Sequence, residues 1–403
     1  FVKNKKTDDE LLEVKVVFHV VYNTPEENIP DSVFVNQIRV LNESYSRTNA
    51  DTSNMRSIYN DIAGNPNIKF TLATEDPDGN PTNGITHTNT NVEYFGGVLP
   101  YSANEQQKII EWVNDTFYQN IGRLTNASKG GVDAWNTDEY LNIWIGDLRI
   151  LEPEFDDFEE ILFYALATPP VNHYNFNAYP LDEIYDNIDD GILMHFPVVG
   201  PNNPTDFEAP YNGSDGLVDR GQTMVHEVGH YLGLRHIWGD GDCTADDFID
   251  DTPTSAASNG FTCNKGKNTC TDSTGTDLPD MVENFMDYSA NACANSFTKG
   301  QVWVMRETVK RGRASFVSVK ELDANSQSSF IVYPNPSNGT FTIGLKESVG
   351  ESNYRVINLQ GKVVAEGTMM QPSKQINLNT AKGIYFVEVT NNGVTQRKRV
   401  VVF

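Results

Sequence analysis

Histidine and cysteine are scarce in this chain, with seven and four among 403 residues. Long apolar runs are absent as well: no stretch of eighteen apolar residues occurs, so we expect no membrane-spanning helix. The first residues, FVKNKKTDDE, lack the apolar core that is typical of a signal peptide. If the protein is secreted, we therefore expect that its leader, and with it a pro-segment, has been removed from this chain.

Positive charge is also in short supply, with 30 Lys and Arg against 55 Asp and Glu. A net charge of −25 argues against nucleic acids and anionic membranes as partners. The charge is uneven, because residues 330–403 carry a net +4 and the remainder carries −29. The length suggests two or three domains, and the contrast in charge predicts two units of different origin.

Three of the seven histidines lie within eleven residues, in the stretch HEVGHYLGLRH that begins at His226. On a helix, His226 and His230 lie on one face, where two imidazoles can bind one metal ion. Glu227 is then placed to act as a general base toward a water on that ion. Gly233 permits a sharp turn that returns His236 as a third ligand. Three neutral imidazoles leave a fourth position open, as in catalytic zinc sites.

An ordinary amphipathic helix that carries two histidines by chance is the alternative for this stretch. The added glycine and third histidine make that coincidence about a thousand-fold rarer, so the whole pattern favours zinc. The remaining histidines are scattered, and we expect them to be strand or loop residues rather than ligands: His19, His87, His173 and His195.

The pattern H-E-x-x-H-x-x-G-x-x-H, followed about fifty residues later by a methionine in ENFMDYS, is the metzincin signature. Weak similarities to one metzincin family, the pappalysins, are LNESYSRTNAD (41–51) and GGVDAWNTDEYLNIWI (130–145). These stretches and the stronger similarities given next together cover roughly residues 11–318. The stretches that carry the resemblance most strongly are RGQTMVHEVGHYLGLRHIWGDGDC (220–243), DDFIDDTP (246–253), NFMDYSANAC (284–293) and FTKGQVWVMR (297–306).

The resemblance implies an α+β metzincin catalytic domain over residues 1–318, with a twisted mixed sheet, a zinc helix and a loop-rich lower part. It implies a zinc endopeptidase in which the three histidines hold the metal and Glu227 activates water. It also implies that Met286 packs beneath the metal and that Tyr288 assists catalysis. An astacin- or adamalysin-type metzincin is the alternative within the same class, and the cysteines and DDFIDDTP argue against it.

All four cysteines fall in the segment after the zinc pattern. Their spacing lacks the C-x-x-C pairs of structural zinc sites, so we expect two disulfides and an oxidising compartment. The sequence by itself leaves three pairings open. The pappalysin resemblance implies the pairs Cys243–Cys270 and Cys263–Cys293.

Acidic residues crowd the segment GDGDCTADDFIDDTP, residues 239–253. Its spacing is not that of an EF-hand. So many carboxylates in one loop repel each other unless a cation neutralises them or water solvates them. A solvated acidic loop therefore remains the alternative to a structural calcium site. For calcium, the resemblance implies the ligands Asp246, Asp247, Asp250 and Thr252.

Hydrophobic periodicity and turn residues predict the elements of the first unit. Together they indicate a mixed sheet backed by helices. A cap at Asp31 or Ser32 is expected for the first helix. We expect strands at 13–22, 68–73, 141–148, 163–168 and 191–196, and helices at 31–48, 104–118 and 217–235.

The sequence pattern changes after a polar segment, residues 319–329, which we expect to be a linker. Residues 330–403 alternate short apolar runs with Gly, Asn and Pro turns, which predicts an all-β Ig-like sandwich of about seven strands. A generic binding sandwich is the alternative interpretation of this part. It resembles the C-terminal sorting domain of the type IX secretion system in YPNPSNG (333–339), INLQGKVV (357–364), GIYFVEV (383–389) and RKRVVVF (397–403).

That second resemblance implies a protein secreted or held at the cell surface of a Bacteroidetes-type bacterium, with the secretion machinery as a partner. The combined prediction is a secreted endopeptidase that acts on proteins or peptides with one catalytic zinc ion and structural calcium. A surface adhesin stabilised by zinc and calcium, without activity, is the alternative from another class. An intact Glu227 and Gly233 argue against it, because a structural zinc ion needs neither a base nor an open position.

Overall fold

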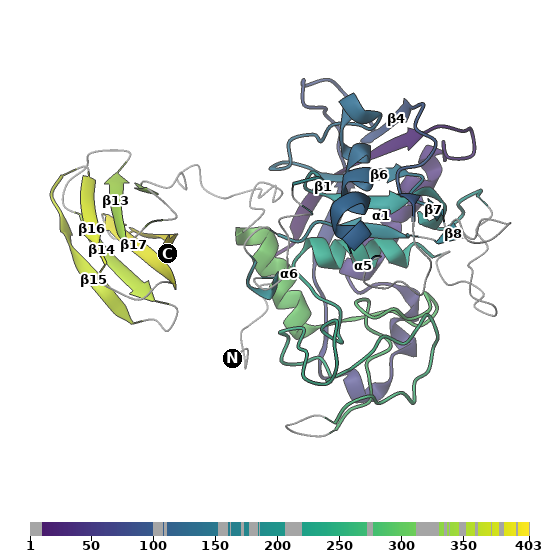
Figure 1. Ribbon diagram of the computed structural model, residues 1–403. Helices are drawn as coiled ribbons and strands as arrows, with labels where there is room; N and C mark the ends of the chain where they lie inside the picture. Colours follow the sequence, from purple (N-terminus) through teal and green to yellow (C-terminus); the bar gives the residue numbers. More distant parts are fainter. Residues whose placement is uncertain are drawn as a thin grey trace. The chain divides into compact units, whose positions relative to one another are not determined.

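The computed structural model divides the chain into two units, Phe1–Val319 and Lys320–Phe403, and each is described by itself (Figure 1). The predicted linker, 319–329, lies outside the described residues. The structure describes residues 10–99, 108, 111–151, 160–161, 163–170, 173–176, 184, 186–205, 220–271, 277–311, 330–333, 337, 339–345, 352–358, 362–371, 373–378, 383–391 and 394–402.

A six-stranded sheet forms the upper part of the first unit. Its strands run parallel except at one edge, where β9 is antiparallel to β10. Nearly all of β1 and all of β6 are buried, because both faces of the sheet are covered. The strands are β1 (Leu12–Tyr22), β3 (Ile68–Leu72), β4 (Ile85–Asn89), β6 (Leu141–Gly146), β9 (Ala165–Ala167) and β10 (Ile192–His195).

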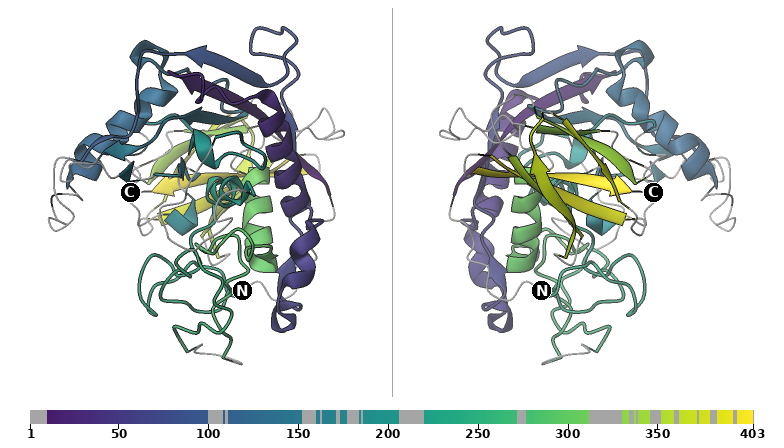
Figure 2. Two further views of the ribbon diagram at one scale, coloured as in Figure 1. Left: turned by 90° about the vertical axis from the view of Figure 1, so that its right-hand side faces the viewer. Right: turned by 90° about the vertical axis from the view of Figure 1, so that its left-hand side faces the viewer.

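Two helices pack on one face of this sheet, and a third follows the loop-rich part. Helix α1 (Asp31–Tyr45) contacts β3, and α5 (Gln222–Tyr231) contacts β9 and β10. The Tyr45 hydroxyl donates to the Val225 carbonyl at 3.0 Å, which joins α1 to α5. Helix α6 spans Lys299–Arg311. Between α5 and α6 the described residues contain almost only turns and loops, which lie below the sheet (Figures 1 and 2).

The α+β layout, mixed sheet and loop-rich lower part confirm the predicted fold class. The predicted cap of α1 is wrong, because Pro30 holds the cap position in an extended conformation and the helix already includes Asp31. The zinc helix is shorter than the predicted 217–235. Gly221 at φ +75° precedes its start and Gly233 at φ +97° follows its end, and such left-handed conformations do not continue a helix.

Other differences are local. The predicted helix at 104–118 is partly outside the described residues, and its described end contains a π-helical turn, Val113–Phe117, followed by α3 (Tyr118–Ile121). Strand β4 and helix α6 were not predicted. The remaining short elements of the first unit are η1 (Ala50–Asn54), η2 (Ser57–Tyr59), β2 (Ala63–Gly64), β5 (Gly97–Val98), η4 (Gly122–Thr125), η5 (Ala127–Lys129), β7 (Ile150–Leu151), β8 (Glu160–Ile161), η6 (Tyr174–Phe176), η7 (Phe196–Val198) and β11 (Phe297–Thr298).

The second unit confirms the predicted all-β sandwich. Its described strands form one sheet in the order β12-β13-β16 and another in the order β15-β14-β17-β18. Buried side chains between them include Phe330, Phe341 and Val387. The strands are β12 (Phe330–Tyr333), β13 (Thr340–Leu345), β14 (Ser352–Asn358), β15 (Val363–Met369), β16 (Ser373–Asn377), β17 (Gly383–Asn391) and β18 (Val394–Val402).

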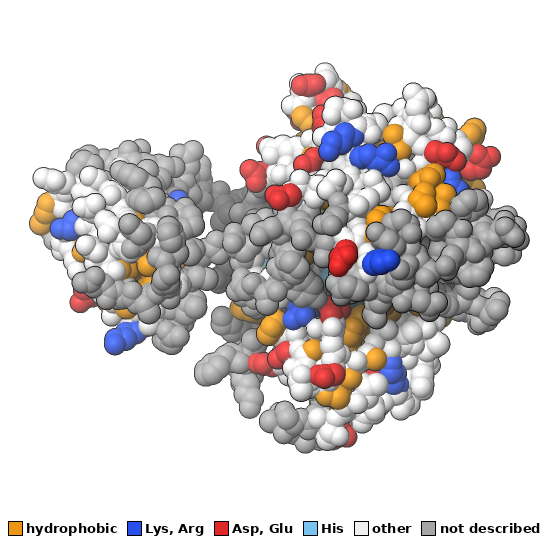
Figure 3. Space-filling view, in the orientation of Figure 1, with side chains coloured by type: hydrophobic (Ala, Val, Ile, Leu, Met, Phe, Trp, Pro, Cys, Tyr) orange, Lys and Arg blue, Asp and Glu red, His pale blue; other side chains and the backbone are white. Residues whose placement is uncertain are grey.

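Two further properties of the described residues are the hydrophobicity of the helices and the distribution of surface charge. In the described parts of both units, we find no helix with the length and hydrophobicity needed to cross a bilayer. On the face of the first unit seen in Figure 3, the acidic and basic side chains of the described residues are scattered among uncharged ones.

Candidate metal centre

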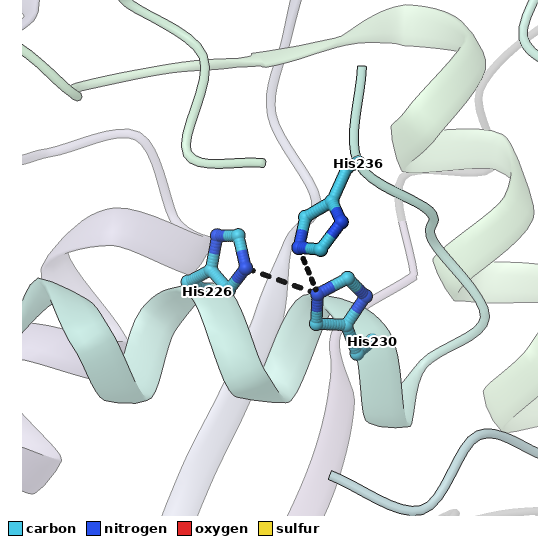
Figure 4. Close-up of side chains that lie close together, drawn as sticks. All are labelled: His226, His230 and His236. Atoms are coloured by element: carbon cyan, nitrogen blue, oxygen red, sulfur yellow. Dashed lines mark hydrogen bonds between the residues drawn. The ribbon is translucent and has the colours of Figure 1, made fainter. Parts of the chain in front are cut away.

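The three histidines of the zinc pattern converge on one point. His226 and His230 project from α5, and His236 approaches from the chain that follows the helix (Figure 4). The Nε2 atom of His230 lies 3.0 Å from that of His226 and 3.1 Å from that of His236. Four-coordinate zinc with bonds of about 2.0–2.1 Å would hold its nitrogens about 3.3 Å apart. The spacing is therefore close to what one zinc ion requires.

Hydrogen bonds at the far side of each ring fix which nitrogen carries the proton. His226 Nδ1 lies 2.7 Å from the Phe285 carbonyl oxygen, and His230 Nδ1 lies 2.8 Å from that of Leu234. His236 Nδ1 lies 2.5 Å from Asp240 Oδ1. These oxygens only accept, so each Nδ1 donates and each neutral ring presents an Nε2 lone pair. Three lone pairs so close together repel unless a cation lies among them, so the donor set fits a metal ion.

Burial keeps the imidazoles of His226 and His230 uncharged. Burial lowers the pKa of His226 well below its ordinary value and that of His230 to about 3. His236 is oriented by two residues that the sequence pattern did not reveal. The Trp238 ring stacks on it at 4.2 Å between centroids and 5° between planes, and Asp240 accepts its Nδ1–H. Outer partners of this kind commonly hold a ligand in its binding orientation.

Gly233 makes the turn that returns the chain to His236. A side chain at this position would lie 2.7 Å from His173 Nε2 and 2.9 Å from Thr308 Oγ1. Asn175 Nδ2 donates to the Gly233 carbonyl at 2.8 Å. His173, predicted to be an ordinary loop residue, therefore lies against the turn, and Asn175 binds its backbone. Neither contact was predicted, because both residues are more than fifty positions away in sequence.

The turn around Met286 supports the histidines from below. Met286 is fully buried, and a methyl group on Gly229 of α5 would overlap its sulfur. The preceding carbonyl, of Phe285, accepts from His226, and the Met286 carbonyl accepts from Ile237 N at 3.3 Å. The turn around Met286 therefore fixes both the His226 ring on α5 and the backbone of Ile237, which follows His236.

The segment after this turn caps α5. Asn291 Oδ1 accepts from the backbone N–H groups of Arg220 and Gln222, at 3.3 and 3.4 Å. The amide side chain satisfies donors at the start of the helix, which otherwise have no partner within it. Asn291 therefore positions the start of α5.

Glu227 directly follows His226 on α5, and the residue is buried, with 8% of its surface exposed. Burial raises the pKa of its carboxyl to about 8, and the Ala167 N–H of the edge strand β9 donates to it. Tyr288 also faces the rings. Its ring centroid lies 4.8 Å from that of His236 and 5.3 Å from that of His226, and the residue is 38% exposed. The Tyr288 phenol thus borders the histidine centre, and the buried Glu227 carboxyl belongs to the same helix as His226 and His230.

The acidic segment does not gather its carboxylates. Asp247 is buried, accepts from Thr252 Oγ1 at 2.9 Å through both oxygens, and has its pKa raised to about 8 by burial. Asp246 and Asp250 are exposed. Among the residues that the structure describes, the only group of three metal-binding side chains close enough to share an ion is the histidine group. Side-chain positions therefore provide no evidence for calcium.

The loop-rich part is held by covalent and ionic contacts. Cys243 pairs with Cys270 and Cys263 with Cys293, the arrangement that the resemblance implied. Arg56, which lies between η1 and η2, contacts the fully buried Glu283 at 2.7 and 2.8 Å. Since a buried carboxylate is costly without a partner, this ion pair ties the loop-rich part to the segment that follows α1.

Residues 203–310 match the peptidase family described as Pregnancy-associated plasma protein-A, and residues 331–403 match the secretion system C-terminal sorting domain. Extracellular metalloproteases of Arthroderma benhamiae and Trichophyton verrucosum are each 42% identical over 106 residues, 25% of this chain and 34% of theirs. The chain thus spans about a third of the length of these relatives.

Solved structures match over a longer range. Mature mirolysin of Tannerella forsythia, in complex with a cleaved peptide, has 36% identity and a TM-score of 0.55, covering 77% of this chain and 96% of that chain. A promirolysin mutant of the same organism has 36% identity and a TM-score of 0.56, covering 76% and 84%. Since nearly all of mature mirolysin is matched at this identity, and the converging histidines lie within residues 203–310, the chain belongs to the pappalysin family of metalloproteases.

Proposed function

We propose that the first unit is a zinc endopeptidase that cleaves peptide bonds in proteins. The observation that carries the proposal is the convergence of three Nε2 lone pairs, with the buried Glu227 next to His226 along α5. His226, His230 and His236 would hold a zinc ion, which would supply a Lewis acid to acidify a water molecule and polarise the scissile carbonyl. Mirolysin, which this chain resembles, has been crystallised with a cleaved peptide, and this agrees with a peptide as substrate.

Glu227 acts as the general base in this proposal. Its carboxylate takes a proton from the attacking water and passes it to the leaving amine. A divalent cation nearby favours the charged carboxylate and so offsets the burial that raises its pKa. The Ala167 N–H donates to the carboxyl and holds it against β9. Tyr288, which faces the three histidines, donates a hydrogen bond from its phenolic O–H to the oxyanion that forms on the substrate.

The rival function is a metal-stabilised adhesin without activity. A structural site needs no buried carboxyl beside the ligands, and this argument favours the enzyme. Casein or gelatin digestion distinguishes the two: the enzyme cleaves, a zinc chelator stops it, and added zinc restores it. An adhesin binds zinc and leaves both proteins intact. The Glu227→Gln variant, purified in the same way, excludes a contaminating protease.

The second unit serves export in this proposal, through the machinery that reads the sorting domain matched at residues 331–403. Deleting 330–403 is expected to leave kcat and KM unchanged, since every proposed site residue lies in the first unit. In the native host, the truncated chain should remain in the periplasm, as immunoblots of medium and cell fractions would reveal. Full-length Glu227→Gln is the matched control and should still be exported. Normal secretion of the truncated chain would rule out the sorting role.

Calcium in the acidic segment remains a proposal, supported by the crowding of acidic residues in the sequence at 239–253. Since a ligand stabilises the state that binds it, calcium at a hundred times its Kd is expected to raise Tm by roughly 5 °C. Removal should also expose residues 239–270 to self-cleavage. Calorimetry with zinc kept loaded measures the shift, and Asp247→Asn should abolish it. Identical melts with calcium and with a calcium-selective chelator would contradict the proposal.

A further inference from the structure

One residue near the site has a backbone conformation that its side chain disfavours. In the turn Asn259-Gly260-Phe261-Thr262, the two central residues have φ +62° and +56°. Thr262 N donates to the Asn259 carbonyl at 3.4 Å, which closes the turn. Turns with positive φ at both central positions strongly prefer glycine or asparagine there. A phenylalanine at the second position is strained, and such strain persists where the side chain has a role.

The contacts of the Phe261 ring suggest that role. The ring stacks on Tyr288 with 5.6 Å between centroids and 5° between planes. The Phe261 N–H donates to the Tyr288 carbonyl at 2.6 Å, so backbone and side chain meet the same residue. The Tyr164 ring, which just precedes β9, meets Phe261 edge-on at 6.0 Å and 78°. Phe261 therefore lies between Tyr288 and the edge of the sheet.

Tyr288 is held from its other sides by the metal centre itself. Its ring meets that of His236 at 4.8 Å and 70°, and that of Trp238 at 5.0 Å and 65°. The residue is nevertheless 38% exposed. The parallel stack on Phe261 opposes a swing of the ring away from the histidines.

The turn that carries Phe261 is firmly attached to the segment that carries Tyr288. Asn259 N donates to Asp287 Oδ1 at 3.1 Å, and Ala290 N donates to the Thr262 carbonyl at 3.1 Å. The disulfide Cys263–Cys293 follows at once. A ring presented from so fixed a backbone can hold its neighbour in one position.

We propose that Phe261 is a positioning residue for Tyr288 and holds its phenol toward the three histidines. The inference rests on the proposed function, because it gives Tyr288 a part in catalysis. The alternative is that Phe261 only fills space between the upper and lower parts. The two accounts differ in what they predict for kcat when the fold is retained.

The Phe261→Gly variant separates the effect of the ring from that of the backbone. Glycine adopts a positive φ without strain, and it lacks the ring that stacks on Tyr288. We expect Tm to be retained, kcat on a quenched peptide to fall on the order of ten-fold, and KM to change by less than about two-fold. Phe261→Tyr keeps the ring and should keep kcat. Phe248→Gly is the matched control, since Phe248 also has positive φ, +63°, but is 50% exposed and lies under Arg235. It should leave kcat unchanged.

A double-mutant cycle with Tyr288→Phe tests whether the effect passes through the phenol. In the Tyr288→Phe background, Phe261→Gly should change kcat by less than about two-fold. An undiminished ten-fold loss there, or a wild-type kcat for Phe261→Gly alone, would overturn the positioning role. If Tyr288→Phe itself has a wild-type kcat, both the role of Tyr288 and this proposal fail. Cleavage by the unmodified chain would still support the endopeptidase.

Discussion

Glu227→Gln is expected to lower kcat/KM for peptide hydrolysis by about 10²–10⁴-fold, the range typical for loss of a general base. Glutamine keeps the shape of the side chain and can still accept from the Ala167 N–H, so the fold and the histidine geometry should be preserved. Zinc content should stay at that of the unmodified chain. Rates on a quenched peptide and metal analysis of the same sample measure both quantities.

The control for this substitution is Glu43→Gln, which changes an exposed glutamate paired with Arg39 on α1. It removes the same charge far from the metal centre and should leave the rate unaltered. If Glu227→Gln kept more than a few per cent of the activity, another group would have to be the base. Loss of zinc from that variant would mean that the carboxyl supports binding rather than proton transfer.

His230→Ala is expected to weaken zinc binding by at least about a hundred-fold, because the ligands of a typical zinc site share its binding free energy. His230 is the central ring, because its Nε2 is within 3.1 Å of both other Nε2 atoms. Its loss also removes the hydrogen bond to the Leu234 carbonyl beside the Gly233 turn. Peptide hydrolysis should be lost, and zinc should no longer raise Tm, since the ion then stabilises the folded state less.

A matched control is His87→Ala, because His87 lies on the surface and contacts Asn28 and Asp31 instead of the metal centre. Competition with a fluorescent zinc chelator gives the affinity of each variant. An unchanged affinity in His230→Ala would mean that zinc binds elsewhere, and the convergence of the three rings would then have another explanation.

Much of this centre could be predicted because its information is local. The i, i+4 spacing of His226 and His230 needs only a helix, and Gly233 signals a turn by itself. The first and last residues of α5 could not be predicted from such local signals. They depend on positive φ at Gly221 and Gly233, which the three-dimensional packing around those residues determines.

Contacts between segments that are distant along the chain could not be predicted from the sequence. Asn291 caps α5 from about seventy residues away, and Asn175 binds the Gly233 carbonyl across 58 residues. Phe261 resembles any apolar loop residue until its φ angle and its stack on Tyr288 are known. These residues share a property: each acts on a metal-site segment through geometry that only the folded chain creates.

Two regular elements were missed for physical reasons. Strand β4, with the sequence ITHTN, is short and polar, and it pairs with β1 because β1 is long enough to hold β3 and β4 one after the other on the same side. Helix α6 contains Gly300 and several β-branched residues, which weaken helix propensity. Its formation depends on packing, since Val302, Val304 and Met305 are buried in the main core.

The most direct test of the central claim is a titration of the metal-free chain with zinc, with the rate of peptide hydrolysis measured at each step. Three converging imidazoles beside Glu227 predict no activity without metal, a linear rise and a break at one zinc ion per chain. Glu227→Gln should bind the same single ion and stay inactive. Hydrolysis that proceeds without metal, or a chain that binds one zinc ion and cleaves no peptide, would contradict the account.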